Sequence, residues 1–385
     1  MRSGPPLVGI IIILTGYVGL HLYMWARLIR STELPPPWRR RAIAALSLLA
    51  LYAPSSFVLA RIAGAHWPRA LIWPAVLWLG LALYLVLALV ATDVARWLAE
   101  LWIWIQDRER LRLPATRRRL YRGFAAAALA SAATATGIGA STAACGPIVA
   151  EVDVPLRGLS PALDGLRIVQ LSDLHVGRTI GRRYVEQVVG EVQALEPDLV
   201  VITGDLVDGT VPDLRDSVAP LFDLRPRHGV YFVTGNHDHY SGAGPWRAHL
   251  AAGGIRVLSN RSARIGEGEA SLDLAGVEDP RGSVDLPGAL ERCDPDTPTV
   301  LLAHRPEAVF GAAPAGVDLQ LSGHTHGGQL WPFTFFVSQA TPYPAGLHRH
   351  GETWIYVSVG TGYVGPPIRL GTRAEITLLT LRREP

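Results

Sequence analysis

The two halves of the chain carry different patterns of hydrophobic and polar positions. Four long uncharged stretches dominate the chain up to about residue 145. From residue 146 onward, short apolar runs alternate with helix-like patterns and polar segments. The contrast predicts a transmembrane region over 1–145 and an α/β domain over 146–385, which is long enough to bury a substantial core.

Each uncharged stretch approaches or exceeds the roughly 20 residues that cross a bilayer as a helix. The predicted membrane helices are 7–25, 42–60, 71–92 and 123–144. The first three are rich in Leu, Ile, Val and Trp. The fourth is mostly Ala, Thr, Ser and Gly, so it could be a spanning helix or a flexible linker. No charged residue lies within the four stretches, which argues against an ion channel or a transporter.

Arginines between the stretches predict the orientation of the helices in the membrane. The loop after the first stretch contains Arg27, Arg30, Arg39, Arg40 and Arg41. The segment after the third contains Arg96, Arg108, Arg110, Arg112, Arg117, Arg118, Arg119 and Arg122, whereas the loop after the second has only Arg61 and Arg69. The positive-inside rule places the first and third of these segments in the cytoplasm. If the fourth stretch spans, the domain lies on the extracytoplasmic side.

Two segments beside these stretches allow two interpretations each. "WLAELWIWI" (97–105) could lie on the inner membrane surface as an interfacial helix or extend the third span. "TRRRLY" (116–121) is similar to a twin-arginine export signal, or it anchors the fourth span by its positive charge.

Five apolar runs in the second half end in a polar residue, which predicts strands of βαβ units. The runs are "LRIVQLSD", "DLVVITGD", "GVYFVTGN", "PTVLLAH" and "VDLQLSGH", ending at Asp173, Asp205, Asn236, His304 and His324. A helical stripe is predicted over 182–195, and a Gly pair closes a second helix at 253–254. Ligands of open α/β sheets bind beyond the carboxyl ends of strands, so these five side chains predict one shared site.

Composition narrows the possible partners and cofactors. All 36 basic residues are arginine, and the formal net charge is only +3. Because the arginines cluster beside the apolar stretches, they indicate membrane topology and not nucleic-acid binding. The two cysteines form no CxxC motif, which excludes a zinc ribbon and a thioredoxin-type site.

The polar strand ends belong to five motifs in a fixed order. They are "DLH" (173–175), "GDLVD" (204–208), "GNHD" (235–238), "AH" (303–304) and "GHTH" (323–326). The set resembles the calcineurin-like metallophosphoesterase superfamily, in particular its membrane-associated bacterial branch with an N-terminal transmembrane region. The resemblance covers about 160–385, including a closing segment at 356–381. It implies an α/β fold, a β-sandwich flanked by helices (αββα-like), in a protein of the bacterial inner membrane.

The resemblance also implies a site with two divalent ions. The expected ligands are Asp173, His175, Asp205, Asn236, His304, His324 and His326. Asp205 would bridge the ions, His326 would bind the first and His324 the second, aimed by local kinks at Gly323 and Gly327. Nitrogen and oxygen ligands suit Mn, Fe, Zn or Co, without fixing the metal.

Three further residues take expected catalytic roles from the same resemblance. His237 would donate a proton to the leaving group, and Asp238 would orient it. Asp208 would orient the metal ligands or cap a turn. Two divalent ions outweigh the charge of two aspartate ligands, so the site should attract an anionic substrate.

The expected function is therefore a membrane-anchored, dinuclear metal-dependent phosphoesterase. Its substrate would be a phosphorylated small molecule or a lipid-linked one, such as a UDP-2,3-diacylglucosamine-like compound or a phospholipid. The alternative is a non-catalytic module that binds a phosphorylated ligand at the membrane. The aromatic stretch 331–350 could form an apolar rim over the site or pack as an ordinary loop. Arg305 and Arg369 could contact phosphate or lie on the surface.

Overall fold

The computed structural model describes residues 7–63, 68–106, 114–268 and 270–384. The chain divides into two compact units, Met1–Ile138 and Gly139–Pro385. The division falls inside a helix, whose last turn packs with the second unit: Ala143 is buried in its core, and Gly139 O accepts a hydrogen bond from Arg369 N at 2.9 Å.

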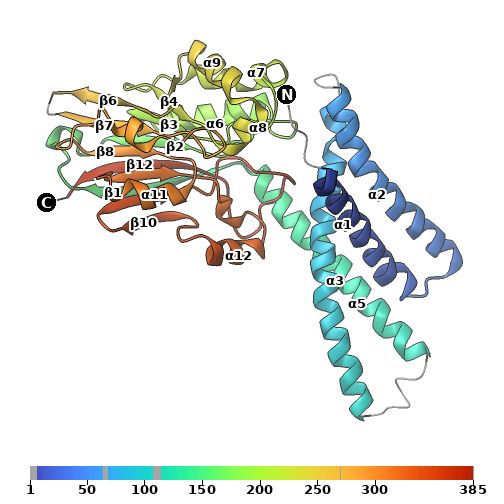
Figure 1. Ribbon diagram of the computed structural model, residues 1–385. Coiled ribbons are helices and arrows are strands. Elements are labelled where there is room, and N and C mark those ends of the chain that lie inside the picture. The colour runs from blue at the N-terminus through green and yellow to red at the C-terminus, as the bar shows by residue number, and fades with distance from the viewer. Residues whose placement is uncertain (1–6, 64–67, 107–113, 269, 385) are drawn as a thin grey trace. The chain divides into compact units, whose positions relative to one another are not determined.

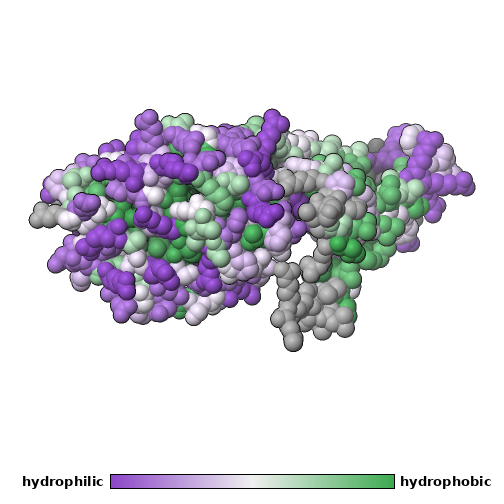
Figure 2. Space-filling model, turned by 90° about the horizontal axis from the view of Figure 1, so that it is seen from above, coloured by the Kyte–Doolittle hydropathy of each residue, from purple (hydrophilic) through white to green (hydrophobic). Residues whose placement is uncertain are grey.

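The first unit is helical (Figure 1). Its elements are α1 (Leu7–Trp25), the π-helical turn η1 (Ala26–Arg30), α2 (Pro36–Ala63), η3 (Arg69–Leu71), α3 (Trp73–Gln106) and α5 (Pro114–Ala144). Four helices in the described residues are long and apolar enough to cross a membrane. Large apolar side chains are exposed on them, for example Ile13 and Leu51, and Figure 2 shows hydrophobic residues over much of the visible helical surface. Burial in lipid removes such side chains from water.

Two segments with open interpretations are helical. Residues 97–105 continue α3 without a break, so they extend the third helix and are not a separate interfacial helix. The weakly apolar fourth stretch lies in α5, which is a continuous helix and not a flexible linker. Arg108, Arg110 and Arg112 lie outside the described residues.

The second unit is a sandwich of two six-stranded mixed sheets. The first sheet has the order β1 (Ile148–Leu156), β12 (Glu375–Arg383), β2 (Arg167–Leu171), β3 (Leu199–Thr203), β4 (Val230–Val233) and β5 (Arg256–Val257). The second has the order β10 (Gly346–His350), β11 (Thr353–Val357), β9 (Leu319–Ser322), β8 (Thr299–Leu302), β7 (Ala270–Gly276) and β6 (Arg261–Glu267). The strands β2–β3–β4 are parallel neighbours, and so are β8 and β9.

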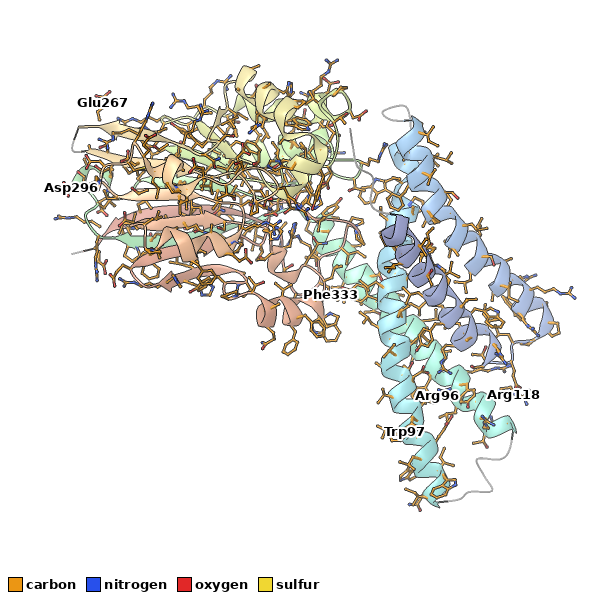
Figure 3. The ribbon with its side chains drawn as sticks, viewed as in Figure 1. Arg96, Trp97, Arg118, Glu267, Asp296 and Phe333 are labelled. Atoms are coloured by element: carbon orange, nitrogen blue, oxygen red, sulfur yellow. The ribbon has the colours of Figure 1, made fainter. Side chains whose placement is uncertain are left out.

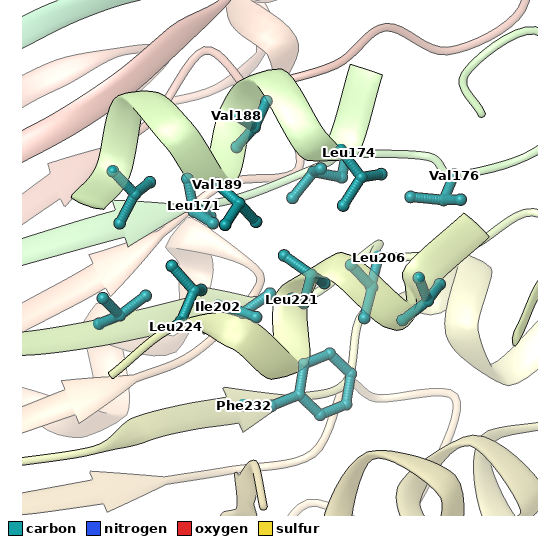
Figure 4. Close-up of a cluster of buried hydrophobic side chains, with 14 of the residues drawn as sticks. Leu171, Leu174, Val176, Val188, Val189, Ile202, Leu206, Leu221, Leu224 and Phe232 are labelled. Atoms are coloured by element: carbon teal, nitrogen blue, oxygen red, sulfur yellow. The ribbon is translucent and has the colours of Figure 1, made fainter. Parts of the chain in front are cut away.

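Helices cover the outer faces of both sheets. The first sheet is covered by α6 (Arg182–Ala194), α7 (Val211–Val218), η5 (Ala219–Asp223) and α9 (Ala243–Ala252), and the second by α10 (Leu286–Leu290) and α11 (Val309–Ala312). The other short elements of the domain are α8 (Asn236–Ser241), α12 (Phe333–Ala340), η4 (Pro161–Leu163), η6 (Pro306–Ala308) and η7 (His326–Gly328). In Figure 4, Val188 and Val189 of α6 and Leu221 of η5 pack with Leu171 and Ile202 of the first sheet. The architecture is the predicted αββα sandwich.

Apolar patterning explains this layering. Residues of β2, β3 and β4 are buried on both faces, as expected for parallel strands covered on two sides. One face joins the sandwich core, where Ile168 and Val201 lie in one cluster with Val300 and Leu321 of the second sheet. The predicted helices are also present, as α6 and α9, and Gly253 ends α9.

Candidate metal centre

The predicted site residues converge where the carboxyl ends of the two sheets meet. Two hydrogen bonds join the sheets at this edge: Gln170 Nε2 donates to Ser322 O at 2.8 Å, and His304 Nδ1 faces Thr203 O at 2.8 Å. Because neighbouring parallel strands end at the same edge, the loops after β2, β3, β4, β8 and β9 open onto one place.

One cluster of ligand atoms consists of Asp173, His175 and His326, all buried. The Nε2 atoms of His175 and His326 lie 3.1 Å apart, and His326 Nε2 lies 3.4 Å from Asp173 Oδ1. One ligand atom from each residue lies within 4.8 Å of the others. These three residues form a group of the size that a single ion requires.

A second cluster consists of Asp205, His304 and His324. His304 Nε2 lies 3.3 Å from Asp205 Oδ2 and 3.2 Å from His324 Nδ1. Asn236 lies beside this cluster, because the two terminal nitrogens of Arg305 contact Asn236 Oδ1 at 3.4 Å and His324 Nε2 at 3.3 Å. The structure thus places His324 and His326 in different clusters.

Asp205 lies between the two clusters. Its Oδ2 atom is 3.3 Å from His304 Nε2 in the second cluster and 3.9 Å from His175 Nε2 in the first. Its Oδ1 atom accepts a hydrogen bond from His237 N at 2.7 Å. One carboxylate therefore reaches both groups, which is the position that a bridging ligand needs.

The hydrogen bonds of the imidazoles fit divalent metal ions. The Nδ1 of His304 faces a carbonyl and that of His175 faces Asp208 Oδ2 at 3.1 Å, so in the neutral rings both Nδ1 atoms carry the hydrogen. Each Nε2 atom then presents a lone pair to the carboxylate oxygens of Asp205. Only a proton or a cation between these acceptors satisfies them, and neutral imidazole with carboxylate is a donor set that transition metals bind.

Charges within the clusters shift the pKa values of their members. Burial alone would raise the pKa of Asp173, but the imidazoles of His326, His304 and His175 outweigh it and hold that pKa far below its usual range. Burial disfavours a charged His304, yet Asp205 raises its pKa to about 10. Burial, His304 and Arg305 lower the pKa of His324 to about 4, so His324 is the neutral imidazole that a metal requires.

Asp208 joins His175 to His237. Its Oδ2 accepts from His175 Nδ1 at 3.1 Å and its Oδ1 accepts from His237 Nδ1 at 2.6 Å. These three residues also lie close enough to hold a metal ion, but both Asp208 oxygens already accept hydrogen bonds from the two imidazoles. Burial opposes the charge on His237, and Asp208 outweighs burial, so the pKa of His237 is raised. Asp208 is therefore the partner that orients His237.

Asp238 does not orient His237, contrary to the sequence-based expectation. Its carboxylate is buried and accepts from the backbone nitrogens of Leu206 at 3.0 Å, Val207 at 3.2 Å and Gly235 at 2.8 Å. Burial and the nearby Asp205 raise the pKa of Asp238 to about 7. Asp238 fastens the loop after β3 to the loop after β4, which the sequence could not show because all three partners are backbone groups.

The backbone is strained at the ligand positions. Five of them have positive φ angles, between 50° and 72°: Asp173, His175, Asp205, His324 and His326. Such conformations cost about 1–3 kcal/mol each for residues other than glycine, and persist where the surroundings enforce them. Strain at five of the six residues in the two clusters indicates that the loops are shaped for function.

Of the two glycines expected to kink the chain around GHTH, Gly327 does so and Gly323 does not. Gly327 has a positive φ of 57°, as a kink requires, but Gly323 is not among the positive-φ glycines. A Cβ atom at Gly323 would lie 2.0 Å from Ser172 Oγ and 2.2 Å from Asp173 Oδ2. Gly323 is therefore needed for close packing against the first ligand loop, and His324 and His326 themselves make the turns.

Two arginines that the sequence could not separate have different positions. Arg305 is partly exposed, its Nε donates to the buried Asp279 at 2.6 Å, and its terminal nitrogens face Asn236 and His324. Arg369 is fully buried and donates to the carbonyls of Val359 and Gly362 at 2.6–2.9 Å. Arg305 is available to a phosphate, whereas Arg369 supports the backbone behind His326.

The fold and site are those of an αββα protein with a candidate metal centre, and comparisons with known proteins name its family. Residues 166–328 match the family model of calcineurin-like phosphoesterases. The chain is 44% identical over 266 residues to a bovine "transmembrane protein with metallophosphoesterase domain", covering 64% of this chain and 60% of the relative. It is 34% identical over 231 residues to an uncharacterised metallophosphoesterase of Bacillus subtilis, covering 57% of this chain and 80% of the relative.

The chain belongs to the calcineurin-like metallophosphoesterases, a family of metal-dependent phosphoesterases. It spans about 60% of the length of the bovine and zebrafish relatives. A phosphopantetheinyl hydrolase from Mycobacterium tuberculosis has a TM-score of 0.34 and 14% identity over 54% of this chain and 96% of that structure. The relatives include vertebrate proteins as well as bacterial ones, so this type of protein is not confined to bacteria.

Proposed function

We propose that the protein is a membrane-anchored phosphoesterase with two divalent metal ions, and that residues 146–385 are its catalytic domain. The position of Asp205 supports this most directly, because its carboxylate lies between the two ligand clusters. Asp173, His175 and His326 would hold one ion, and Asn236, His304 and His324 the other. When bound, the ions supply positive charge to the phosphate and to its developing transition state.

The other side chains of the site serve binding and proton transfer. Asp208 fixes the Nδ1 side of His237 at 2.6 Å, so the Nε2 side of the ring is free to donate a proton to the leaving group. Asp279 holds the guanidinium of Arg305 beside Asn236, where it would contact a phosphate oxygen. A module that only binds phosphate has no use for an oriented proton donor, so this arrangement favours catalysis.

Turnover by the purified full chain tests the proposal. With Mn²⁺, the protein should hydrolyse a chromogenic phosphodiester or monoester, and Asp205→Asn should abolish turnover. His237→Ala should lower kcat by about 10²–10⁴-fold. His239→Ala is the matched control, because His239 contacts Thr234 and not the ligand clusters. Full activity in both site variants would contradict the proposal, and tight substrate binding without product release would favour the non-catalytic alternative.

We further propose that the substrate carries a lipid. Beside the His326 turn, the segment leading into α12 and the helix itself expose four aromatic side chains: Trp331, Phe333, Phe335 and Phe336. Phe335 and Phe336 are 60% and 57% exposed, and Phe333 is labelled in Figure 3. A water-exposed aromatic group of this size marks a surface that contacts an apolar partner. A phospholipid or a lipid-linked pyrophosphate combines such an apolar part with a phosphate.

Paired substrates test the lipid preference. Phe335→Ser with Phe336→Ser should lower kcat/KM several-fold for a long-chain phosphodiester and leave a short water-soluble diester unchanged. The short substrate is the internal control, because it reports the metal centre without the apolar contact. Equal losses for both substrates would show that α12 acts on the site itself, and no loss for either would exclude a lipid contact here.

A further inference from the structure

The "TRRRLY" segment, which the proposed catalytic function does not use, lines a pocket in the helical unit. The pocket has a volume of about 580 Å³ and lies where η1 and the residues after it meet the start of α5. We call it the arginine pocket; its principal residues are Arg27, Arg30, Glu33, Arg117, Arg118 and Tyr121. Its size lies within the range of small-ligand sites.

The lining is strongly basic. Four of the lining residues are arginines, and among the described lining residues Glu33 is the one acidic side chain. Glu33 lies 3.9 Å from Arg118, a distant pair at an exposed position. Arg27 is paired at 2.9 Å with Asp93, and Glu33 offsets one of the other three arginines, so the lining keeps a net positive charge of about two.

Contacts between the helices preorganise the pocket. Arg122 of α5 donates to Thr32 O at 2.9 Å and to Glu33 O at 2.8 Å, which ties the two walls together. Arg117 donates to the hydroxyl of Tyr121 at 3.1 Å, and Arg96 lies 5.0 Å from the same ring. The arginines of one wall lie on a π-helical turn, a rare geometry that is frequent at functional sites.

The pocket lies at the ends of membrane helices. The first candidate span ends at Arg30 and the fourth begins at Ala115, so both walls of the pocket are span ends. On α3, the residue after Arg96 is Trp97, which is 61% exposed; Figure 3 labels both together with Arg118. Exposed tryptophans mark the headgroup level of a bilayer. The basic pocket therefore faces the layer in which lipid phosphates lie.

We propose that the arginine pocket binds the phosphate of an anionic phospholipid headgroup. Guanidinium groups match phosphate oxygens in pairs and stay charged at all physiological pH values. Basic pockets between membrane helices suit anionic headgroups. This site is separate from the metal centre, and the inference does not depend on phosphoesterase activity.

The test uses the full chain in a zwitterionic detergent, titrated with short-chain phosphatidylglycerol, phosphatidylcholine or inorganic phosphate. Phosphatidylglycerol should raise the melting temperature and bind saturably, and phosphatidylcholine should not. Arg30→Gln with Arg118→Gln should weaken phosphatidylglycerol binding about tenfold or more. Arg39→Gln with Arg40→Gln is the matched control, because it removes the same charge from the exposed start of α2 and should change the affinity less than twofold.

A variant that is expected to bind phosphatidylglycerol more tightly keeps the proposal testable if the arginine variants misfold. Glu33→Gln removes the acidic side chain of the lining and should tighten phosphatidylglycerol binding. Equal weakening in the pocket and control variants would overturn the proposal, because binding would then follow surface charge alone. Saturation by inorganic phosphate with no added effect of phosphatidylglycerol would overturn the lipid assignment and indicate a free anion.

Discussion

The chemistry of the site depends on residues whose roles are set by burial and contact and not by residue type. Arg305 and Arg369 follow different strands and look alike in the sequence. The fold buries Arg369 among carbonyl groups, and it leaves Arg305 partly exposed beside Asn236. In the same way, Asp208 and Asp238 both belong to the motifs, but the carboxylate of Asp208 bonds the His237 ring whereas that of Asp238 bonds backbone nitrogens. The residues that gather in the two clusters could be predicted from motifs, whereas these supporting roles required the three-dimensional contacts.

Replacement of Arg305 tests its proposed contact with phosphate. Arg305→Gln should raise KM about tenfold or more and leave kcat within about twofold, because a hydrogen bond to a charged group contributes about 1.5–3 kcal/mol. Steady-state kinetics on a soluble ester measures both constants. Arg292→Gln, at an exposed position after α10, is the control. An unchanged KM, or a loss of bound metal in the Arg305 variant, would refute a direct role in substrate binding.

Among the secondary-structure elements, the carboxyl ends of strands carry the proposed ligands. The apolar runs predicted β2, β3, β4, β8 and β9, because buried parallel strands read as continuous hydrophobic segments. The sequence did not predict the left-handed backbone at five ligands, since that conformation is enforced by packing from other strands. It also left the segment 97–105 open, because an interfacial helix and a long spanning helix share the same tryptophans.

A substitution that adds one methyl group at Gly323 tests the close packing between the ends of β2 and β9. Gly323→Ala would place Cβ within 2.2 Å of Asp173 Oδ2 and should displace the loop that carries Asp173. The variant should therefore lose bound metal and most of its turnover. Gly311→Ala is the matched control, since its Cβ meets only Leu286 at 3.5 Å. Metal analysis of both proteins measures the effect. Normal metal content in Gly323→Ala would show that the contact does not position Asp173.

At the scale of the whole molecule, a helical unit precedes an αββα domain. Hydrophobicity alone predicted this organisation, because uncharged stretches of membrane length differ plainly from short amphipathic elements. The side of the membrane on which the domain lies depends on whether α5 spans. We propose that the domain is extracytoplasmic. The arginine-rich segments after the first and third helices are predicted to lie in the cytoplasm, so a spanning α5 would carry the chain to the other side.

Reporter fusions test this orientation. An alkaline phosphatase fused after residue 150 should be active, and a green fluorescent protein at the same position should be dark after Sec-dependent export. Fusions after residue 106, the end of α3, should give the opposite pair of results and serve as the control. Fluorescence at residue 150 would place the domain in the cytoplasm. That result would favour a cytoplasmic substrate such as a UDP-linked lipid.

Metal content of histidine variants distinguishes one bound ion from two, because His324 and His326 lie in different ligand clusters. After loading with Mn²⁺ and desalting, the full chain should retain about two metal ions, as a two-metal site requires. His324→Ala and His326→Ala should each retain about one, and the double variant should retain none. A double variant that keeps as much metal as either single variant would contradict the account, because both histidines would then hold the same ion.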